Sequence, residues 1–141
     1  SDVVNVNLMG TLRICHAMLP KLALSRGNII NLTSINSRKA SASIPAYAST
    51  KSGLESLTKS MAACWASHYV RVNSVAPGWI EGKTNDILTG ELKDYNYHER
   101  IPLKRLGKPD EVANVIVFLA SKYASYITGA TILVDGGFSI N

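Results

Sequence analysis

Tyr47 and Lys51 stand four residues apart in the segment AYASTK, residues 46–51. If this segment is helical, the two side chains lie on the same helix face. A phenol has a pKa of about 10 and is a poor proton carrier at neutral pH, but a nearby ammonium group favours the phenolate and lowers that pKa. The pair could therefore supply general acid–base catalysis, although the same spacing also fits one polar face of an ordinary helix.

Two further polar residues could complete such a site. Ser34 ends the apolar, β-branched segment NIINLTS, residues 28–34, which predicts a buried strand. Ligands of open parallel sheets bind beyond the carboxyl ends of the strands, so the Ser34 hydroxyl could hydrogen-bond a substrate oxygen next to Tyr47. A turn residue at a strand exit is the alternative. Asn7 interrupts an apolar helical pattern, where its amide could bond to backbone or hold a buried water.

The elements that must position these residues alternate between helices and strands. Apolar residues at steps of three and four predict helices over 2–24 and 46–67. A third helix is predicted to begin at Pro109, which is followed by two acidic residues. Apolar runs predict strands over 28–34, 70–76 and 131–137. Such an alternation predicts an α/β fold, namely a partial Rossmann-like doubly wound parallel sheet of three strands with helices on both faces. We expect residues 1–141 to form one domain.

The composition argues against several other classes of protein. The chain is 46% hydrophobic and 18% charged, which is typical of a globular protein. No apolar run approaches the roughly 18 residues of a membrane span, and the first residues show no secretory signal. We therefore expect a cytoplasmic protein with no membrane partner. The net charge of +5 comes from scattered basic residues without interleaved aromatic residues, which argues against nucleic acid as a partner.

The cysteines and histidines indicate no metal site. Cys15 and Cys64 each fall within a predicted helix, and we expect both to be buried, reduced thiols. The three histidines are isolated and match no metal-ligand spacing. The sequence thus predicts no metal ligands.

Over its whole length the chain resembles the short-chain dehydrogenases/reductases. Ser34 precedes Tyr47 by 13 residues, as the pattern of that family requires. The resemblance rests on six segments in the family's order: NLMG (7–10), IINLTS (29–34), Tyr47-x-x-x-Lys51, VRVNSVAPG (70–78), GKPDEVANVIVFLAS (107–121) and ITGATILVDGG (127–137).

The resemblance implies hydride transfer between a nicotinamide cofactor, NAD or NADP, and a small-molecule alcohol or carbonyl substrate. Tyr47 would be the acid–base residue, and Lys51 would lower its pKa and hold the nicotinamide ribose. Ser34 would position the substrate oxygen. Asn7 would hold a water molecule that continues the proton relay.

The resemblance also implies which backbone contacts the nicotinamide. These residues are Pro77, Gly78, Trp79 and Ile80. The family often has a threonine four residues after the glycine of the Pro-Gly pair, but this chain has Gly82 there. We expect Thr84, two residues later, to take over that contact through a shifted loop.

The resemblance covers the C-terminal half of the family's domain. No G-x-G-x-x-G-like turn for the pyrophosphate occurs in the sequence, and the segment that separates NAD from NADP has no counterpart. We therefore interpret residues 1–141 as the C-terminal half of a Rossmann-like dehydrogenase domain. The strand at 28–34 should then expose an apolar edge, and the isolated chain should bind dinucleotide weakly, show little activity and self-associate.

Two other interpretations remain open. The segment GWIEGKT, 78–84, resembles a phosphate-binding loop of nucleotide hydrolases, but it has three residues between glycine and Gly-Lys-Thr where that loop needs four. Alternatively, the chain is a non-catalytic interaction or dimerisation module derived from a dehydrogenase. The small residues of helix 46–67, together with helix 2–24, resemble the family's dimerisation surface, so we expect a homo-oligomer. That small-residue face comprises Ser49, Gly53, Ser56, Ser60 and Ala63.

Overall fold

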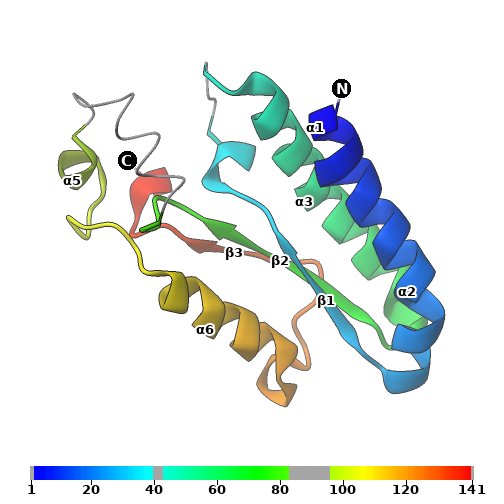
Figure 1. The fold of residues 1–141 in the computed structure, drawn as a ribbon. Coiled ribbons are helices and arrows are strands. Elements are labelled where there is room, and N and C mark those ends of the chain that lie inside the picture. Colours follow the sequence, from blue (N-terminus) through cyan, green and yellow to red (C-terminus); the bar gives the residue numbers. More distant parts are fainter. Residues whose placement is uncertain (1, 40–42, 83–95, 141) are drawn as a thin grey trace.

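The computed structural model describes residues 2–39, 43–82 and 96–140. Its α/β architecture is a three-stranded parallel sheet with helices on both faces, which confirms the predicted fold class (Figure 1). The elements in chain order are α1 (Asp2–Val4), the π-helix η1 (Asn5–Gly10), α2 (Thr11–Ser25), β1 (Asn28–Leu32), the 3-10 turn η2 (Ile35–Ser37), α3 (Pro45–Trp65), η3 (Ala66–His68), β2 (Arg71–Pro77), α5 (Tyr97–Arg100), α6 (Pro109–Ala120), η4 (Lys122–Ala124), β3 (Thr131–Val134) and η5 (Phe138–Ile140).

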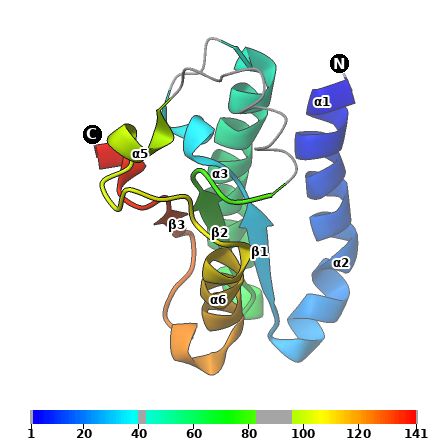
Figure 2. The same cartoon turned by 60° about the vertical axis from the view of Figure 1, so that its left-hand side comes forward.

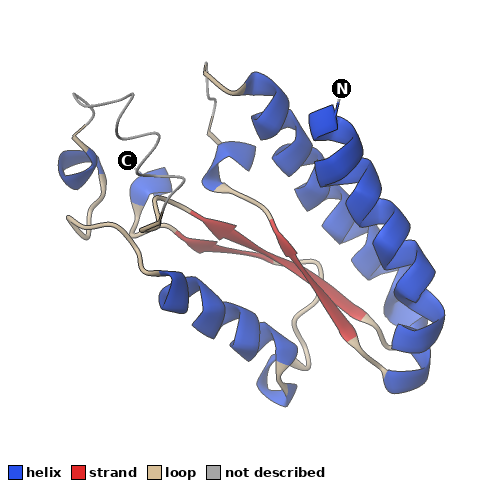
Figure 3. Ribbon diagram, viewed as in Figure 1, coloured by secondary structure: helices blue, strands red, loops and turns tan. Residues whose placement is uncertain are grey.

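The strand order β1-β2-β3 follows the chain. Ile29 lies opposite Val72, and Val75 lies opposite Ile132, in parallel register. Parallel neighbours need a crossover connection, and here α3 joins β1 to β2 while the segment with α6 joins β2 to β3 (Figure 3). Among the described residues β1 is an edge strand, as predicted, and the exposed Leu32 lies at its end.

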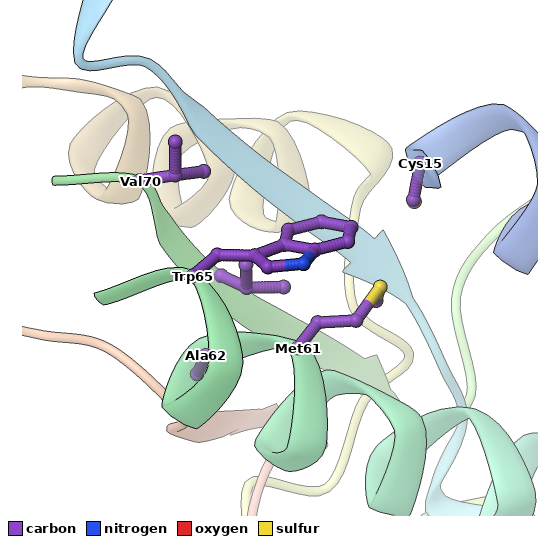
Figure 4. Packing of buried hydrophobic residues seen from close by; sticks show 6 residues of the cluster. Cys15, Met61, Ala62, Trp65 and Val70 are labelled. Atoms are coloured by element: carbon purple, nitrogen blue, oxygen red, sulfur yellow. The ribbon is translucent and has the colours of Figure 1, made fainter. Parts of the chain in front are cut away.

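The helices divide between the two faces of the sheet. α3 packs on one face with the helical segment Asp2–Ser25 beside it, and α6 packs on the other face (Figures 1 and 2). On the α3 side, Trp65 and Met61 meet Cys15 of α2 and Val70 at the start of β2 (Figure 4). These contacts tie α2 and α3 into one layer over the amino-terminal half of the sheet.

The predicted helix 2–24 has nearly the right extent but is not a uniform α-helix. Residues Asn5–Gly10 form a π-helical segment within it. The Thr11 hydroxyl donates to the Asn7 carbonyl at 3.0 Å, which gives that carbonyl a side-chain partner inside the helix. π-helical segments are rare and frequently mark functional sites, and this one contains Asn7.

Other boundaries differ from the predicted ones by a few residues. β1 ends at Leu32, because the backbone then leaves the strand pairing and enters the η2 turn. Helix α3 begins at Pro45 and ends at Trp65. The prediction for Cys64 was wrong. Cys15 is buried, but Cys64 is exposed, because a rotation of about 100° per residue separates it from its buried neighbour Trp65 on α3.

None of the helices in the described ranges is long and apolar enough to cross a membrane. Those ranges also hold no group of three or more His, Cys, Asp or Glu side chains placed to bind a metal ion.

The first turn of α6 carries an ion pair at its amino terminus. Arg105 donates to both oxygens of Glu111 at 2.7 Å, and the Lys108 backbone N–H donates to Glu111 at 2.8 Å. The hydrogen bond from Arg105, followed by that from Lys108, lowers the pKa of Glu111 from 4.5 to about 2. Glu111 thus closes the start of the helix in its ionised form.

Glu111→Gln should make thermal unfolding less sensitive to acid. Because the folded-state pKa of Glu111 is depressed, its stabilising contribution is present above pH 4.5 and is lost as the pH falls towards 2. The effect should be small, since the pair is exposed to solvent. Between about pH 5 and about pH 2.5, we expect the Tm of the wild type to drop more than the Tm of Glu111→Gln. Circular dichroism during heating measures both Tm values. Asp110→Asn is the control, and equal drops in wild type and Glu111→Gln would contradict the prediction.

Candidate active site

Ser34 lies just beyond β1, at the carboxyl end of the sheet. Its side chain is buried, and its Oγ accepts the Asn36 backbone N–H at 3.2 Å. Its carbonyl accepts the Ser37 backbone N–H at 3.0 Å, and the Ser37 hydroxyl lies 2.5 Å from the same carbonyl oxygen. Among the described residues the Ser34 hydroxyl donates to no acceptor, so its hydrogen can be offered to a ligand oxygen.

Tyr47 and Lys51 occupy the first turns of α3, beside the exit of β1. Lys51 Nζ donates to the Leu32 carbonyl at 2.7 Å and lies 5.6 Å from the centre of the Tyr47 ring. Burial lowers the pKa of Lys51, because the half-buried ammonium is poorly solvated. The ammonium group is therefore held between the phenol ring and the end of β1, two residues before Ser34.

Asn7 joins the same region from the π-helical segment. Its Nδ2 lies 3.5 Å from Thr50 Oγ1, and Thr50 Oγ1 donates to the Tyr47 carbonyl at 2.7 Å. A Cβ on Gly53 would lie 3.1 Å from the Leu8 side chain, so glycine permits this close approach of the two helices. The structure thus gathers Asn7, Ser34, Tyr47 and Lys51 at one end of the sheet.

The segment expected to contact the nicotinamide follows β2 at that end. Gly78 N–H donates to the Val134 carbonyl at 2.9 Å, and the Trp79 carbonyl accepts from Gly107 N–H at 2.9 Å. The Trp79 ring packs edge-on to Phe138, with ring centres 6.3 Å apart. Trp79 and Phe138 share a hydrophobic cluster with Ile35, the residue after Ser34. The segment from Pro77 to Ile80 is therefore packed next to the Ser34 turn.

The position where the family often has threonine has a backbone that favours glycine. Gly82 has φ +144°, a conformation that side-chain-bearing residues rarely adopt. Thr84, expected to replace that threonine, lies outside the described residues. Its contact with a cofactor stays a prediction, as do the roles of the other site residues.

Gly78→Ala should destabilise the carboxyl end of the sheet. A Cβ at this position would lie 2.7 Å from Asp135 Cβ and 2.8 Å from Asp135 Cα, so backbone would have to move. We expect a loss of about 1–3 kcal/mol in the free energy of unfolding, measured by urea denaturation. Gly107→Ala is the matched control, because its closest contact would be the movable Ile80 Cδ1, also at 2.7 Å. A Gly78→Ala variant as stable as the control would contradict the expected clash.

Sequence reasoning missed two polar residues of α3 that serve this region. Thr50 connects Asn7 to the Tyr47 backbone, and Glu55 contacts Ser37 and Arg38 beyond Ser34. A signal for Glu55 was present in the sequence. Lys51 and Glu55 follow Tyr47 by four and eight positions, so all three fall on one helix face. Both Lys51 and Glu55 are charged.

Comparison with known proteins shows the family of this chain. A family profile described as enoyl-(acyl carrier protein) reductase matches residues 1–139. The chain belongs to the short-chain dehydrogenase/reductase family. The 3-oxoacyl-(acyl-carrier-protein) reductase of Aquifex aeolicus is 44% identical over 137 residues, which cover 96% of this chain and 55% of that relative. The corresponding enzyme of Thermotoga maritima is 40% identical over 139 residues, covering 98% of this chain and 56% of the relative.

Solved structures of the short-chain dehydrogenase/reductase family have the same fold. A gluconate 5-dehydrogenase from Burkholderia cenocepacia, in complex with NADP and tartrate, matches with a TM-score of 0.89 at 34% identity, covering 96% of this chain and 54% of that one. A protein from Thermus thermophilus matches with a TM-score of 0.92 at 32% identity, covering 99% of this chain and 60% of that one. The chain thus spans little more than half the length of the relatives it matches.

Proposed function

We propose that this chain carries the acid–base part of an NAD(P)-dependent oxidoreductase that interconverts an alcohol and a carbonyl compound. One observation carries the proposal. The Lys51 ammonium is held at 2.7 Å from the Leu32 carbonyl and 5.6 Å from the Tyr47 ring centre, at the strand end where Ser34 offers a hydroxyl. A phenol beside a fixed cation and a second hydroxyl suits proton transfer to a carbonyl oxygen.

In the reductive direction, Tyr47 gives its hydroxyl proton to the substrate carbonyl oxygen, and the C=O group becomes CH–OH. The Ser34 hydroxyl donates a hydrogen bond to the same oxygen and orients it. Lys51 stabilises the phenolate left on Tyr47, and a water held near Asn7 returns a proton to the site. A bound dihydronicotinamide supplies the hydride for the carbonyl carbon.

The residues of this chain fit the nicotinamide end of the cofactor. The Lys51 ammonium has three hydrogens and gives one of them to the Leu32 carbonyl, which leaves two for ribose hydroxyls. The sequence has no glycine-rich turn for the pyrophosphate. As the acid–base half of a dehydrogenase domain, the chain alone should therefore bind dinucleotide weakly. NADP is the cofactor to test first, because the Burkholderia relative is a complex with NADP.

The substrate class proposed first is a 3-oxoacyl thioester. The curated relatives named above are both 3-oxoacyl-(acyl-carrier-protein) reductases. The gluconate 5-dehydrogenase supports sugar acids as a second class, at a lower identity of 34%. Both classes offer either a carbonyl carbon that can accept a hydride or a hydroxyl-bearing carbon that can release a hydride.

The proposal includes a homo-oligomer that forms through the helical layer of α2 and α3. Several apolar side chains on α2 are exposed, among them Ile14 at 67% and Leu24 at 90%. Of the small-residue face on α3, Gly53 meets Leu8, whereas Ser56, Ser60 and Ala63 are exposed. A second copy covering this layer would remove the apolar residues from water. The two free thiols, Cys15 and Cys64, agree with a cytoplasmic location.

The proposed function is tested by following NADPH absorbance in the full-length protein with an acetoacetyl thioester as substrate. We expect oxidation of NADPH that requires both protein and thioester. Parallel reactions replace the thioester by a ketogluconate, NADPH by NADH, or both by ATP. Phosphate release from ATP without any NAD(P)H oxidation would support the nucleotide-hydrolase interpretation. The absence of both activities, with dimers still present, would support the interaction module.

A further inference from the structure

Glu55 is a buried carboxylate on α3 that the proton-transfer steps do not use. Its residue is 7% exposed, and a buried charge is unfavourable unless it is paired and hydrogen-bonded. The described partners of the carboxylate come from one short segment. The Ser37 hydroxyl contacts Oε1, and Arg38 Nε donates to Oε2 at 3.2 Å. An apolar side chain would fill this space without the cost of desolvating a charge. The carboxylate therefore finds its purpose in the segment that it holds.

That segment is the turn that fixes Ser34. Ser37 closes the turn, because its N–H donates to the Ser34 carbonyl at 3.0 Å. Its hydroxyl lies 2.5 Å from the same carbonyl oxygen and shares its single hydrogen between that oxygen and Glu55 Oε1. The Asn36 N–H donates to Ser34 Oγ at 3.2 Å and orients the side chain itself. Any displacement of Ser37 would therefore move both the backbone and the hydroxyl of Ser34.

Helix α3 holds Ser37 at a second point. Ser52 Oγ donates to the Ser37 carbonyl at 2.8 Å, while Glu55 contacts the Ser37 hydroxyl. The same helix carries Tyr47 and Lys51 one to two turns earlier. The stretch from Tyr47 to Glu55 spans about 12 Å of a single helix. One rigid element thus holds the acid–base pair at one end and the Ser34 turn at the other.

We propose that Glu55, together with Ser52, is a positioning residue that sets where Ser34 stands relative to Tyr47 by clamping Ser37. The inference rests on the proposed function, since it assigns a purpose to the Ser34–Tyr47 geometry. Glu55 does not reach the reacting atoms. It keeps the second hydroxyl of the site where a carbonyl oxygen bound at Tyr47 would meet it.

Amide hydrogen exchange of the full-length protein tests the clamp without substrate. In Glu55→Ala, we expect the amides of Ser37, Arg38 and Lys39 to exchange about tenfold faster than in wild type, with the amides of β1 changed less than about threefold. Thr58→Ala is the matched control. Thr58 is also buried on α3, but it hydrogen-bonds Asn31 of β1 at 2.9 Å and does not contact the turn. This variant should therefore leave the exchange of the turn amides unchanged.

Kinetics with NADPH and the acetoacetyl thioester separate positioning from simple destabilisation. Glu55→Ala should lower kcat about tenfold or more, with the KM for NADPH within about twofold of wild type. Glu55→Gln keeps an oxygen that accepts from the Ser37 hydroxyl, and it should restore most of kcat and the slow exchange of the turn. Thr58→Ala should retain its kcat.

The outcomes distinguish this inference from the proposed function. If Glu55→Ala and Thr58→Ala speed up exchange equally over the whole domain, or lower kcat equally, Glu55 is only a stabilising residue and the inference is overturned. If wild type oxidises no NADPH, the proposed function fails. The exchange of the turn amides would then still decide whether Glu55 clamps Ser37.

Discussion

Replacing Tyr47 by phenylalanine is expected to lower kcat of the full-length protein by about 10³-fold, with the affinity for NADPH changed less than about twofold. The substitution removes only the hydroxyl that gives its proton to the substrate carbonyl oxygen. The ring beside the Lys51 ammonium stays in place, as does the hydrogen bond between Lys51 and the Leu32 carbonyl at 2.7 Å. Loss of the proton donor should therefore appear in turnover and not in cofactor binding.

The measurement is the initial rate of NADPH oxidation at saturating thioester, with NADPH affinity from fluorescence titration. Tyr123→Phe is the control, because Tyr123 is 78% exposed and far along the chain from the site. It removes the same hydroxyl from a surface tyrosine and should leave kcat unchanged. A Tyr47→Phe variant with more than about a tenth of wild-type turnover would rule out Tyr47 as the proton donor.

Replacing Lys51 by methionine is expected to lower kcat by about 10²-fold and to weaken NADPH binding by about tenfold. The methionine fills a similar volume but removes the ammonium that faces the Tyr47 ring and the Leu32 carbonyl. The phenolate left after proton transfer would lose its cation, and the ribose would lose its charged hydrogen-bond donor. Unlike Tyr47→Phe, this variant should therefore change both kcat and affinity.

The pH dependence gives a second test of Lys51. Burial lowers the pKa of Lys51 below 10.5, so its ammonium is lost at a lower pH than that of a free lysine. Activity should then decline on the alkaline side as Lys51 deprotonates. In Lys51→Arg the cation persists, because a guanidinium stays charged to a pH of about 12, and this alkaline decline should disappear from whatever activity remains. Lys59→Met, an exposed position on the same helix, serves as the control. An unchanged alkaline limb in Lys51→Arg would assign that limb to another group.

The predictable part of the site follows from regular periodicity. Tyr47 and Lys51 share a face because α3 is an ordinary α-helix, and Ser34 lies at the carboxyl end of the sheet because an apolar run ends there. The parallel sheet follows from helices inserted between apolar strands. The pattern that predicts each of these features is local in the sequence, although the strand pairs of the sheet join distant residues.

The remaining features depend on contacts between distant residues. The π-helical turn around Asn7 forms where Leu8 packs on Gly53, and the local pattern of residues 2–24 carries no sign of it. The exposure of Cys64 depends on which side of α3 faces the sheet, which helix periodicity alone left undecided. The contact of Glu55 with Ser37 joins residues 18 positions apart. In each case the sequence identifies the residue but not the distant residues that it contacts in the fold.

The parallel sheet also has a consequence for the order in which the protein can fold. Thr33, the residue after β1, donates a hydrogen bond to the Val75 carbonyl of β2 across 42 residues, and Ser74 of β2 hydrogen-bonds Thr131 of β3 across 57 residues. Sheets built from such non-local pairs fold slowly. At synthesis rates of about 5–20 residues per second, β1 leaves the ribosome roughly 2–8 s before the partner that it needs in β2. During that interval the edge of β1 that faces β2 lacks its backbone hydrogen-bond partners.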